Sequence, residues 1–258
     1  MQNKCCLFVS VFHRILDFNS GLDFYPGPFF IFGQWNYLWL MKVYFISGLA
    51  ADKRVFKYIE LPTGYEAVYL DWIPPYKNES LASYSLRLAA PIDPAEPFAL
   101  VGLSMGGMIA AEITKKIKPE ACVLLCSVPT YKHFPTHFRW AYNLRLHRLV
   151  PVSLVKMASI LKRGFTADNK EDQQLIREVI RDSDPKFIRW AIHAILSWRN
   201  ETIPDRLWHI HGSKDEILPI RYTKPTHTVK GGNHLMIMSK ANELNIFLGE
   251  VLVSTPKK

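Results

Sequence analysis

Cysteine is scarce in this chain of 258 residues, which contains only Cys5, Cys6, Cys122 and Cys126. None of the four shows the C-x-x-C or Cys/His spacing of a zinc site, and two local pairs do not make a disulfide framework. Cys122 and Cys126 lie inside an apolar run and are interpreted as buried thiols. The sequence therefore predicts no metal and no disulfide framework, and it favours a reducing cytoplasm as the compartment.

The chain also lacks internal repeats, low-complexity tracts and dense basic clusters. Its 32 Lys and Arg exceed its 23 Asp and Glu, but the densest internal basic run is only the K-K-I-K of residues 115–118. That run follows a predicted helix, where cations suit the helix dipole. Nucleic-acid binding would need denser basic clusters, so we do not expect it. The length and a hydrophobic content of 48% suit one α/β domain with a sizeable core.

Charge is sparse in residues 1–40, which are rich in aromatic side chains. The apolar run 5–12 resembles the core of a signal peptide, but His13 and Arg14 follow it where small cleavage-site residues belong. The stretch 29–46 is apolar enough to suggest a membrane span, but polar residues interrupt it, so we expect no stable membrane insertion. We predict that residues 1–40 are a non-catalytic extension before a natural start at Met41. A hairpin formed by residues 29–46, which would extend the sheet, is the alternative.

From Met41 onward, strand-like and helix-like segments alternate along the sequence. The predicted strands are short apolar runs, and the predicted helices carry apolar residues on one face. This alternation predicts a mostly parallel sheet with helices on both faces, which is an α/β fold. Right-handed crossovers then bring the strand ends to one edge, where functional sites collect. The predicted strands are 42–47, 67–70, 98–103, 121–126, 207–210 and 226–230, and the predicted helices outside a long insertion are 78–90, 105–117 and 239–251.

The sequence G-L-S-M-G-G at 102–107 joins a predicted strand directly to a predicted helix. A serine at such a sharp turn is strained and its hydroxyl is lifted out of the sheet, and the flanking glycines let neighbouring backbone approach. The N–H of Met105 begins the helix, where free donors and the dipole favour negative charge. A glycine turn that only packs a helix on a strand is the alternative. The strand and helix on either side favour Ser104 as a nucleophile.

A serine hydroxyl needs a general base, and the base needs an acid that orients it. Asp215 lies in H-G-S-K-D-E-I-L-P, directly after a predicted strand, and His234 lies in G-G-N-H after the last predicted strand. Both therefore leave the sheet at the same edge as Ser104. Glu216 is the nearest rival to Asp215, and Asp205 is a weaker rival because it precedes its strand.

Attack by a serine on a carbonyl carbon creates an oxyanion, which two N–H donors should stabilise. The N–H of Met105 is the first expected donor. The second should come from the loop 47–52 after the first predicted strand, where Leu49 is best placed. A plain glycine turn remains the alternative interpretation of this loop.

These motifs resemble the α/β-hydrolase superfamily, in its serine esterase and lipase-like branch, over nearly all of residues 41–258. The serine turn, the acid segment and the G-N-H loop match in order and spacing. The resemblance implies that fold, a mechanism through an acyl-enzyme, and no cofactor or metal. Two features depart from it: Ser47-Gly48 stands where His-Gly is usual, and a start at Met41 would leave out the first two strands of the usual sheet.

The insertion of about 128–204 resembles the helical cap that the family places over its active site. Helices are predicted at 139–148, 151–161, 170–181 and 186–198. Residues 129–200 hold thirteen Lys and Arg against six Asp and Glu. Solvated outer helix faces explain this charge, and a sharper hypothesis is that the cap steers anionic substrates. Five aromatic residues either line an acyl pocket or pack the cap against the core: Phe134, Phe138, Trp140, Trp190 and Trp198.

We therefore expect a serine hydrolase that cleaves a carboxylic ester or a related acyl bond in a small molecule. A serine nucleophile disfavours the dehalogenase and epoxide-hydrolase chemistries of the superfamily. Esterase, thioesterase, amidase, carbon–carbon hydrolase and perhydrolase activities remain open, and S-M-G-G also resembles the metal-free haloperoxidase and perhydrolase branch. A slow or non-catalytic ligand receptor on the same fold is the alternative. The sequence identifies neither the substrate nor the oligomeric state.

Overall fold

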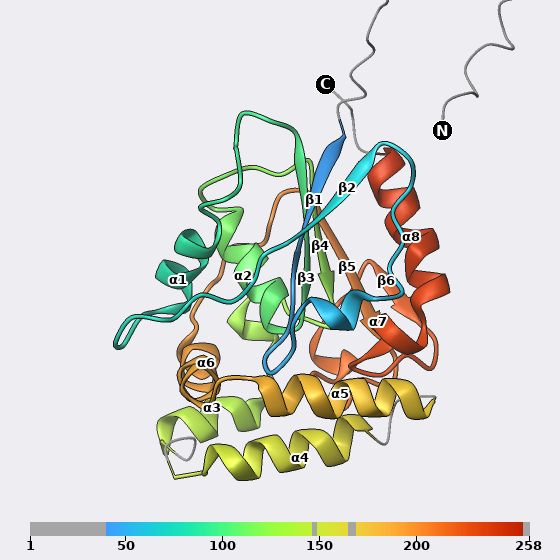
Figure 1. Cartoon of the computed structure of the whole chain (residues 1–258). Coiled ribbons are helices and arrows are strands. Elements are labelled where there is room, and N and C mark those ends of the chain that lie inside the picture. Colours follow the sequence, from blue (N-terminus) through green and yellow to red (C-terminus); the bar gives the residue numbers. More distant parts are fainter. Residues whose placement is uncertain (1–39, 146–148, 165–168, 255–258) are drawn as a thin grey trace, which may run out of the picture. The chain divides into compact units, whose positions relative to one another are not determined.

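Helices cover both faces of a six-stranded parallel sheet in the computed structural model, which describes residues 40–145, 149–164 and 169–254 (Figure 1). The strand order is β2-β1-β3-β4-β5-β6, and every pairing is parallel. The predicted α/β fold, a parallel sheet with helices on both faces, is thus confirmed. The strands are β1 (Met41–Ile46), β2 (Tyr65–Tyr69), β3 (Phe98–Leu103), β4 (Ala121–Leu125), β5 (Leu207–Gly212) and β6 (His227–Val229).

Alternating residues of the central strands enter two separate hydrophobic cores, one on each face of the sheet. In β1, Val43 and Phe45 point into one core, and Tyr44 and Ile46 point into the other. Both sets are apolar because a strand buried on both faces has no solvent-exposed side. The first core includes the helices α7 (Met236–Ser239) and α8 (Ala241–Ser254), and the second includes α1 (Leu81–Leu88) and α2 (Met105–Ile113).

Several element ends differ from the predicted ones for local reasons. Helix α1 begins three residues later than predicted because the Ser80 hydroxyl caps it and accepts the N–H of Ser83 at 3.1 Å. The predicted last helix, 239–251, is α8, which begins at Ala241, and the short helix α7 directly before it was not predicted. The 3-10 helices η1 (Lys53–Phe56), η2 (Tyr131–His133) and η4 (Ile220–Tyr222) were not predicted, since a single turn has no detectable period.

Strand β1 has neighbours on both sides, because it pairs with β2 along one edge and with β3 along the other. Residues 1–39 lie outside the described residues, and they include the first part of the hairpin predicted as an alternative for residues 29–46. The domain division at residue 40 and this hairpin therefore both stay predictions. Within the described ranges, no helix has the length and apolar character needed to span a membrane.

Four helices between β4 and β5 lie beyond the carboxyl ends of the strands, and we call them the cap (Figure 1). They are α3 (Thr136–Asn143), α4 (Val152–Gly164), α5 (Lys170–Asp182) and α6 (Pro185–Ser197). Side-chain caps define where two of them start, because Asn169 accepts the N–H of Asp172 and Asp184 accepts the N–H of Lys186. Helices α5 and α6 contact the hydrolase core, whereas α3 packs on α6, and α4 packs on α5 and α6.

Aromatic side chains attach the cap to the core. The indole of Trp198 donates to the buried carboxylate of Glu112 at 2.7 Å, and the ring of Trp190 lies 4.3 Å from that of Tyr84. Of the five aromatic residues that were candidates for an acyl pocket, Trp190 and Trp198 thus pack the cap against the core. Trp140 neither lines a pocket nor packs against the core, because 68% of it is exposed.

Charged contacts join α5 to η1. The ammonium of Lys57 lies 2.8 Å from the buried carboxylate of Asp172, which also accepts the hydroxyl of Tyr58 at 3.0 Å. Near the other end of α5, Arg54 pairs with Asp182 at 3.1 Å. The contacts of Asp172 hold α5 more strongly than the pair of Arg54 and Asp182, because the Asp172 carboxylate is buried and exposed ion pairs contribute little to stability.

Helix α2 approaches β1 closely at Gly106. A Cβ atom at this position would overlap the carbonyl oxygen of Ile46 and would lie 2.5 Å from that of Ser47. Both neighbours are backbone atoms and cannot rotate away, so only glycine allows α2 to start where it does.

We predict that Gly106→Ala lowers the free energy of unfolding by about 1–3 kcal/mol or more, because the added methyl group forces the helix away from the strand. Gly249→Ala is the matched control, because a methyl group there would meet only a Pro62 side-chain atom, at 3.8 Å. That control should be neutral or should stabilise α8 by up to about 1 kcal/mol. Urea unfolding measures both, and equal stabilities of the two variants would contradict the close approach.

Candidate active site

Ser104 connects β3 to α2 with a backbone conformation that L-residues rarely adopt. Its φ of 54° and ψ of −116° are strained. Three hydrogen bonds hold it there: its N–H donates to Leu125 at 2.9 Å, and its carbonyl accepts from the Ser127 hydroxyl at 2.6 Å and from the Gly107 N–H at 3.0 Å. The predicted sharp turn is therefore present, and the surrounding backbone and side chains keep it in place.

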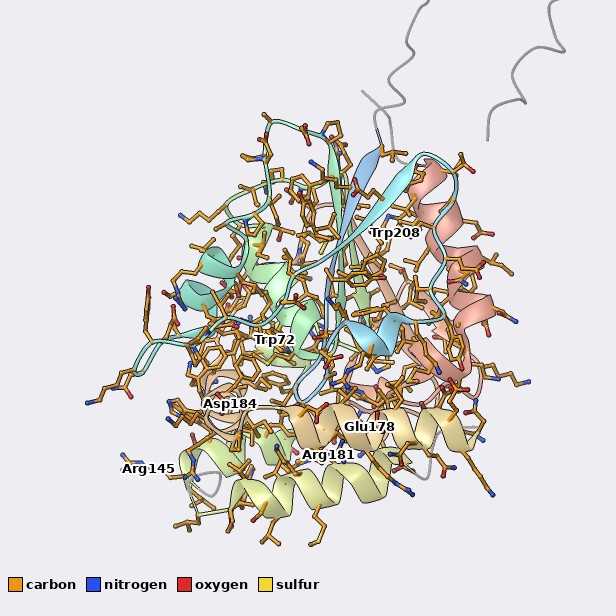
Figure 2. The ribbon with its side chains drawn as sticks, viewed as in Figure 1. Trp72, Arg145, Glu178, Arg181, Asp184 and Trp208 are labelled. Carbon is orange, nitrogen blue, oxygen red and sulfur yellow. The ribbon has the colours of Figure 1, made fainter. Side chains whose placement is uncertain are left out.

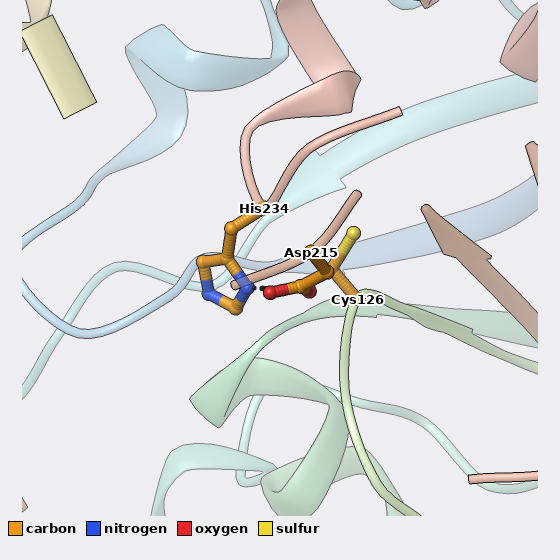
Figure 3. A group of neighbouring side chains, drawn as sticks. All are labelled: Cys126, Asp215 and His234. Atoms are coloured by element: carbon orange, nitrogen blue, oxygen red, sulfur yellow. Dashed lines mark hydrogen bonds and ion pairs between the residues drawn. The ribbon is translucent and has the colours of Figure 1, made fainter. Parts of the chain in front are cut away.

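The structure brings the three predicted catalytic side chains into one line. His234 Nε2 lies 2.9 Å from the Ser104 hydroxyl, and His234 Nδ1 lies 2.8 Å from Asp215 Oδ2 (Figure 3 shows the second contact). Because an ionised carboxylate only accepts, Nδ1 carries the proton, and Nε2 is left to accept the proton of Ser104. This is the arrangement of a nucleophile, a general base and an orienting acid.

Hydrogen bonds surround both oxygens of Asp215, which is 4% exposed. Oδ1 accepts the N–H groups of Ile217 and Leu218, each at 2.9 Å, and Oδ2 contacts His234 and also His211 Nε2 at 3.3 Å. Burial alone would raise the pKa of Asp215, but the two histidines and the Leu218 N–H outweigh it and hold this pKa well below its usual range. Asp215 is therefore ionised at neutral pH.

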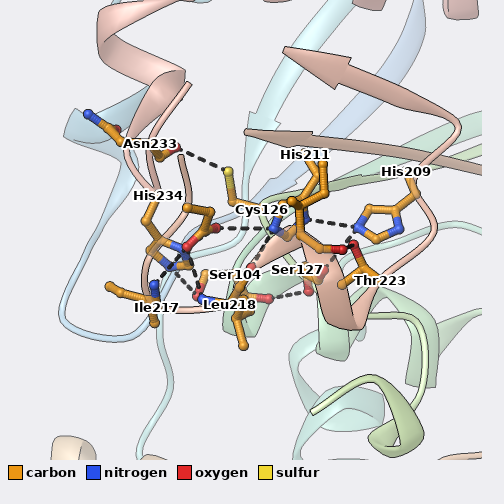
Figure 4. A network of polar contacts seen from close by, with 12 residues as sticks. Ser104, Cys126, Ser127, His209, His211, Ile217, Leu218, Thr223, Asn233 and His234 are labelled. Carbon is orange, nitrogen blue, oxygen red and sulfur yellow. Dashed lines mark hydrogen bonds and ion pairs between the residues drawn. The ribbon is translucent and has the colours of Figure 1, made fainter. Parts of the chain in front are cut away.

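Two further buried histidines lie behind Asp215 (Figure 4). His211 Nε2 donates to the Leu218 carbonyl at 2.7 Å, and His211 Nδ1 lies 3.2 Å from His209 Nε2. His209 Nε2 also contacts the Ser127 carbonyl at 2.9 Å, so it is a donor and His211 Nδ1 is an acceptor. Burial lowers the pKa of His209 to about 3, and the neighbouring His211 adds to this effect. The ring of His209 is thus neutral.

This histidine pair was not predicted from the sequence, although a signal was present. His209 and His211 are two residues apart on a strand and therefore share one face. They lie on the strand that leads to Asp215, and the face they share is the one turned towards Ser127. His211 Nε2 there contacts the carboxylate of Asp215, and His209 donates to His211.

Cys126 completes the buried surroundings of the triad. Its sulfur, a carboxylate oxygen of Asp215 and a ring nitrogen of His234 all lie within 4.8 Å of one another (Figure 3). Burial, and then the charge of Asp215, raise the pKa of the Cys126 thiol, so it stays protonated and is a poor metal ligand. The thiol lies 3.4 Å from the Asn233 carbonyl, to which it donates. These contacts fit a packing role next to the catalytic acid.

Of the two predicted oxyanion donors, Met105 directly follows Ser104, and Leu49 follows Gly48 in the loop next to it. Met105 is the first residue of α2, so its N–H has no acceptor within the helix. The loop that contains Leu49 passes close to the nucleophile, because a Cβ atom at Gly48 would lie 3.2 Å from Ser104 Cβ. A turn closes this loop, with the Ala51 N–H donating to the Gly48 carbonyl at 3.1 Å.

The rivals of Asp215 lie away from the triad. Glu216 is exposed, whereas Asp215 is buried. Asp205 precedes β5, at the opposite end of the strand from Asp215, and it pairs with Lys118 at 2.8 Å. Ser47, which replaces the usual histidine, donates its hydroxyl to the Ala51 carbonyl at 3.0 Å and so fixes the loop beside Ser104.

Comparison with known proteins agrees with this geometry. A model of the alpha/beta hydrolase family matches residues 43–245, so the chain belongs to that family. Similar solved structures include a thermophilic esterase from Thermogutta terrifontis, with 17% identity, a TM-score of 0.64 and coverage of 84% of this chain and 91% of the esterase. MenH from S. aureus has 15% identity and a TM-score of 0.65, with coverage of 83% and 94%.

A hydrolase from Pseudomonas aeruginosa PA01 has 12% identity and a TM-score of 0.66, with coverage of 82% of this chain and 89% of that protein. No curated protein matches the sequence significantly. At these identities the structural likeness establishes the fold, and the specific reaction must be argued from the site itself.

We predict that Asp215→Asn lowers the free energy of unfolding at pH 7 by about 2–3 kcal/mol, because the neutral amide loses the stabilised charge. The native pKa of Asp215 is lowered, so the carboxylate contributes its full share to the free energy of unfolding above its usual unfolded pKa of about 4. This contribution is lost as the pH falls from about 4 through the native pKa. Urea unfolding of both proteins from pH 7 to pH 2 measures the difference.

The matched control is Asp71→Asn, which makes the same substitution at an exposed charge and should change stability by less than about 0.5 kcal/mol. A difference between wild type and Asp215→Asn that persists unchanged at pH 2 would contradict the stabilised carboxylate.

Proposed function

We propose that this protein is a serine hydrolase that cleaves a carboxylic ester or a related acyl bond through a covalent acyl-enzyme. One observation carries the proposal: the Ser104 hydroxyl, the His234 ring and the Asp215 carboxylate are joined by contacts of 2.9 and 2.8 Å. The strained turn at Ser104 and the free N–H at the start of α2 support it.

The chemistry follows from these positions. His234 Nε2 takes the proton of Ser104 while the hydroxyl oxygen attacks the carbonyl carbon, and the N–H groups of Met105 and Leu49 stabilise the oxyanion. Asp215 keeps the imidazole oriented and stabilises its cation. His234 then gives the proton to the leaving alcohol or thiol. In the second half, His234 activates water, which releases the acyl group and restores Ser104.

A ligand receptor on the same fold is the competing proposal. A receptor would have no need for an ionised buried acid behind the histidine, whereas a general base does. The hydrogen bonds that keep Asp215 ionised therefore favour catalysis. Ester, thioester, amide and carbon–carbon substrates, and perhydrolysis, all fit this mechanism.

We predict that wild type hydrolyses a chain-length series of p-nitrophenyl esters and that Ser104→Ala reduces kcat by at least about 10³-fold. A fluorophosphonate should label wild type and leave Ser104→Ala unlabelled, because the probe needs the activated hydroxyl. The exposed Ser83 of α1 supplies the control variant Ser83→Ala, which should retain activity. Folded wild type that shows neither turnover nor labelling would favour the receptor.

We further propose that the acyl substrate carries a distant carboxylate or phosphate. A hollow of about 790 Å³ lies between residues 75–78 and α6. Three cations line it together with His193, Tyr76 and Trp190, and no Asp or Glu is among its lining residues. A hollow of one charge raises the local concentration of oppositely charged molecules. The cations are Lys77, Lys186 and Arg189.

We predict a higher kcat/KM for a p-nitrophenyl ester with a terminal carboxylate than for its neutral isostere, with an advantage that falls as salt is added. The double variant Lys186→Ala/Arg189→Ala should remove most of this advantage. Lys116→Ala, which removes an exposed lysine beyond the end of α2, is the control. Equal rates for both esters, without salt dependence, would contradict an anionic substrate but leave the serine mechanism intact.

A further inference from the structure

Large apolar side chains are exposed on the outer part of the cap. Of the thirteen large hydrophobic side chains that are exposed in the described ranges, six fall between residues 140 and 157, and none belongs to α5 or α6. A soluble surface normally scatters such side chains, so their concentration in one place marks a candidate binding surface. We call these six residues the outer-cap patch: Trp140, Leu144, Leu149, Val150, Leu154 and Met157.

Helix α4 is fixed by its inner side, so its apolar outer side stays exposed. Val155 packs against the hydrophobic core, and the ammonium of Lys156 donates to the carbonyls of Arg181 and Ser183 at 2.8 and 2.5 Å. Leu154 and Met157 are three residues apart and share the opposite side of the helix. Figure 1 shows α4 on the side of α5 that faces away from the sheet.

The segment that carries this patch has charges of one sign. Residues 136–164 contain six Lys and Arg and no Asp or Glu. Arg145, which directly follows Leu144, is exposed at the outer edge of the cap (Figure 2). Helices that combine exposed Trp and Leu with Lys and Arg are typical of protein surfaces that bind anionic lipid headgroups.

We propose that the outer-cap patch binds peripherally to an anionic lipid surface, with its apolar side chains at the level of the headgroups and the exposed Arg145 facing lipid phosphates. A second copy of the chain is a poorer occupant, because it would bring two basic surfaces together. Residues 1–40 are also a poorer occupant, since their two basic and two acidic residues offer no complementary charge. The proposal does not rest on turnover by the triad.

Sedimentation of the full chain with vesicles tests this surface. We expect binding to vesicles of phosphatidylcholine mixed with phosphatidylglycerol, weaker binding in high salt, and little binding to pure phosphatidylcholine. Leu154→Ser/Met157→Ser should reduce partitioning by about tenfold or more, because two apolar side chains no longer leave water. These substitutions change only exposed side chains, and circular dichroism verifies that the variant is folded.

Two control variants test whether binding is specific to the outer-cap patch and independent of the triad. Ile246→Ser removes an apolar side chain of α8 that is 62% exposed, and it should bind vesicles like wild type. Ser104→Ala should also bind normally, which keeps this result independent of the proposed hydrolysis.

Three outcomes would overturn the proposal. The first is folded wild type that does not bind the anionic vesicles at low salt. The second is an equal loss of binding in Leu154→Ser/Met157→Ser and Ile246→Ser. The third is that wild type does not bind vesicles but forms a dimer in analytical ultracentrifugation, and that Leu154→Ser/Met157→Ser is a monomer. A second copy of the chain would then be the occupant of the patch.

Discussion

The strained backbone of Ser104 is the constraint on which the rest of the site depends. A left-handed residue between β3 and α2 turns the chain so sharply that the helix begins against the end of β1, and only Gly106 fits at that contact. The same turn points the hydroxyl at His234 and leaves the Met105 N–H beside it. The bonds to Leu125 and Ser127 show that the end of the neighbouring strand β4 holds this local strain in place.

The second requirement is that the buried carboxylate of Asp215 stays ionised. Asp215 is almost fully removed from water, which by itself favours the neutral acid, and the fold compensates with two backbone N–H groups and the rings of His234 and His211. Backbone N–H groups suit this role because they stabilise the carboxylate and carry no charge that would compete with His234 for it. The carbonyls of Ser127 and Leu218 accept from Nε2 of His209 and of His211, so the protein backbone determines which ring nitrogens carry a proton.

The cap combines two surfaces with different physical character. Its inner helices α5 and α6 contact the core through a buried ion pair and an indole–carboxylate hydrogen bond, which attach them to the hydrolase core. Its outer helices α3 and α4 present apolar side chains to the surroundings, and the exposed Arg145 follows α3. The side of the cap that is attached to the core and the side that is exposed thus differ in character.

The sequence by itself determined the α/β class, the strand-to-helix turn at Ser104, and the positions of Asp215 and His234 after two strands, because alternating periodicity and local glycine motifs encode these features. Only the tertiary structure decided that Asp215 is buried while Glu216 is exposed, that His209, His211 and Cys126 surround the acid, and that β1 lies between two neighbours. The tertiary structure also showed that Trp198 packs against the core while Trp140 is exposed. The physical reason is that burial and hydrogen-bond partners depend on residues far away in the chain, and local periodicity carries no information about those residues.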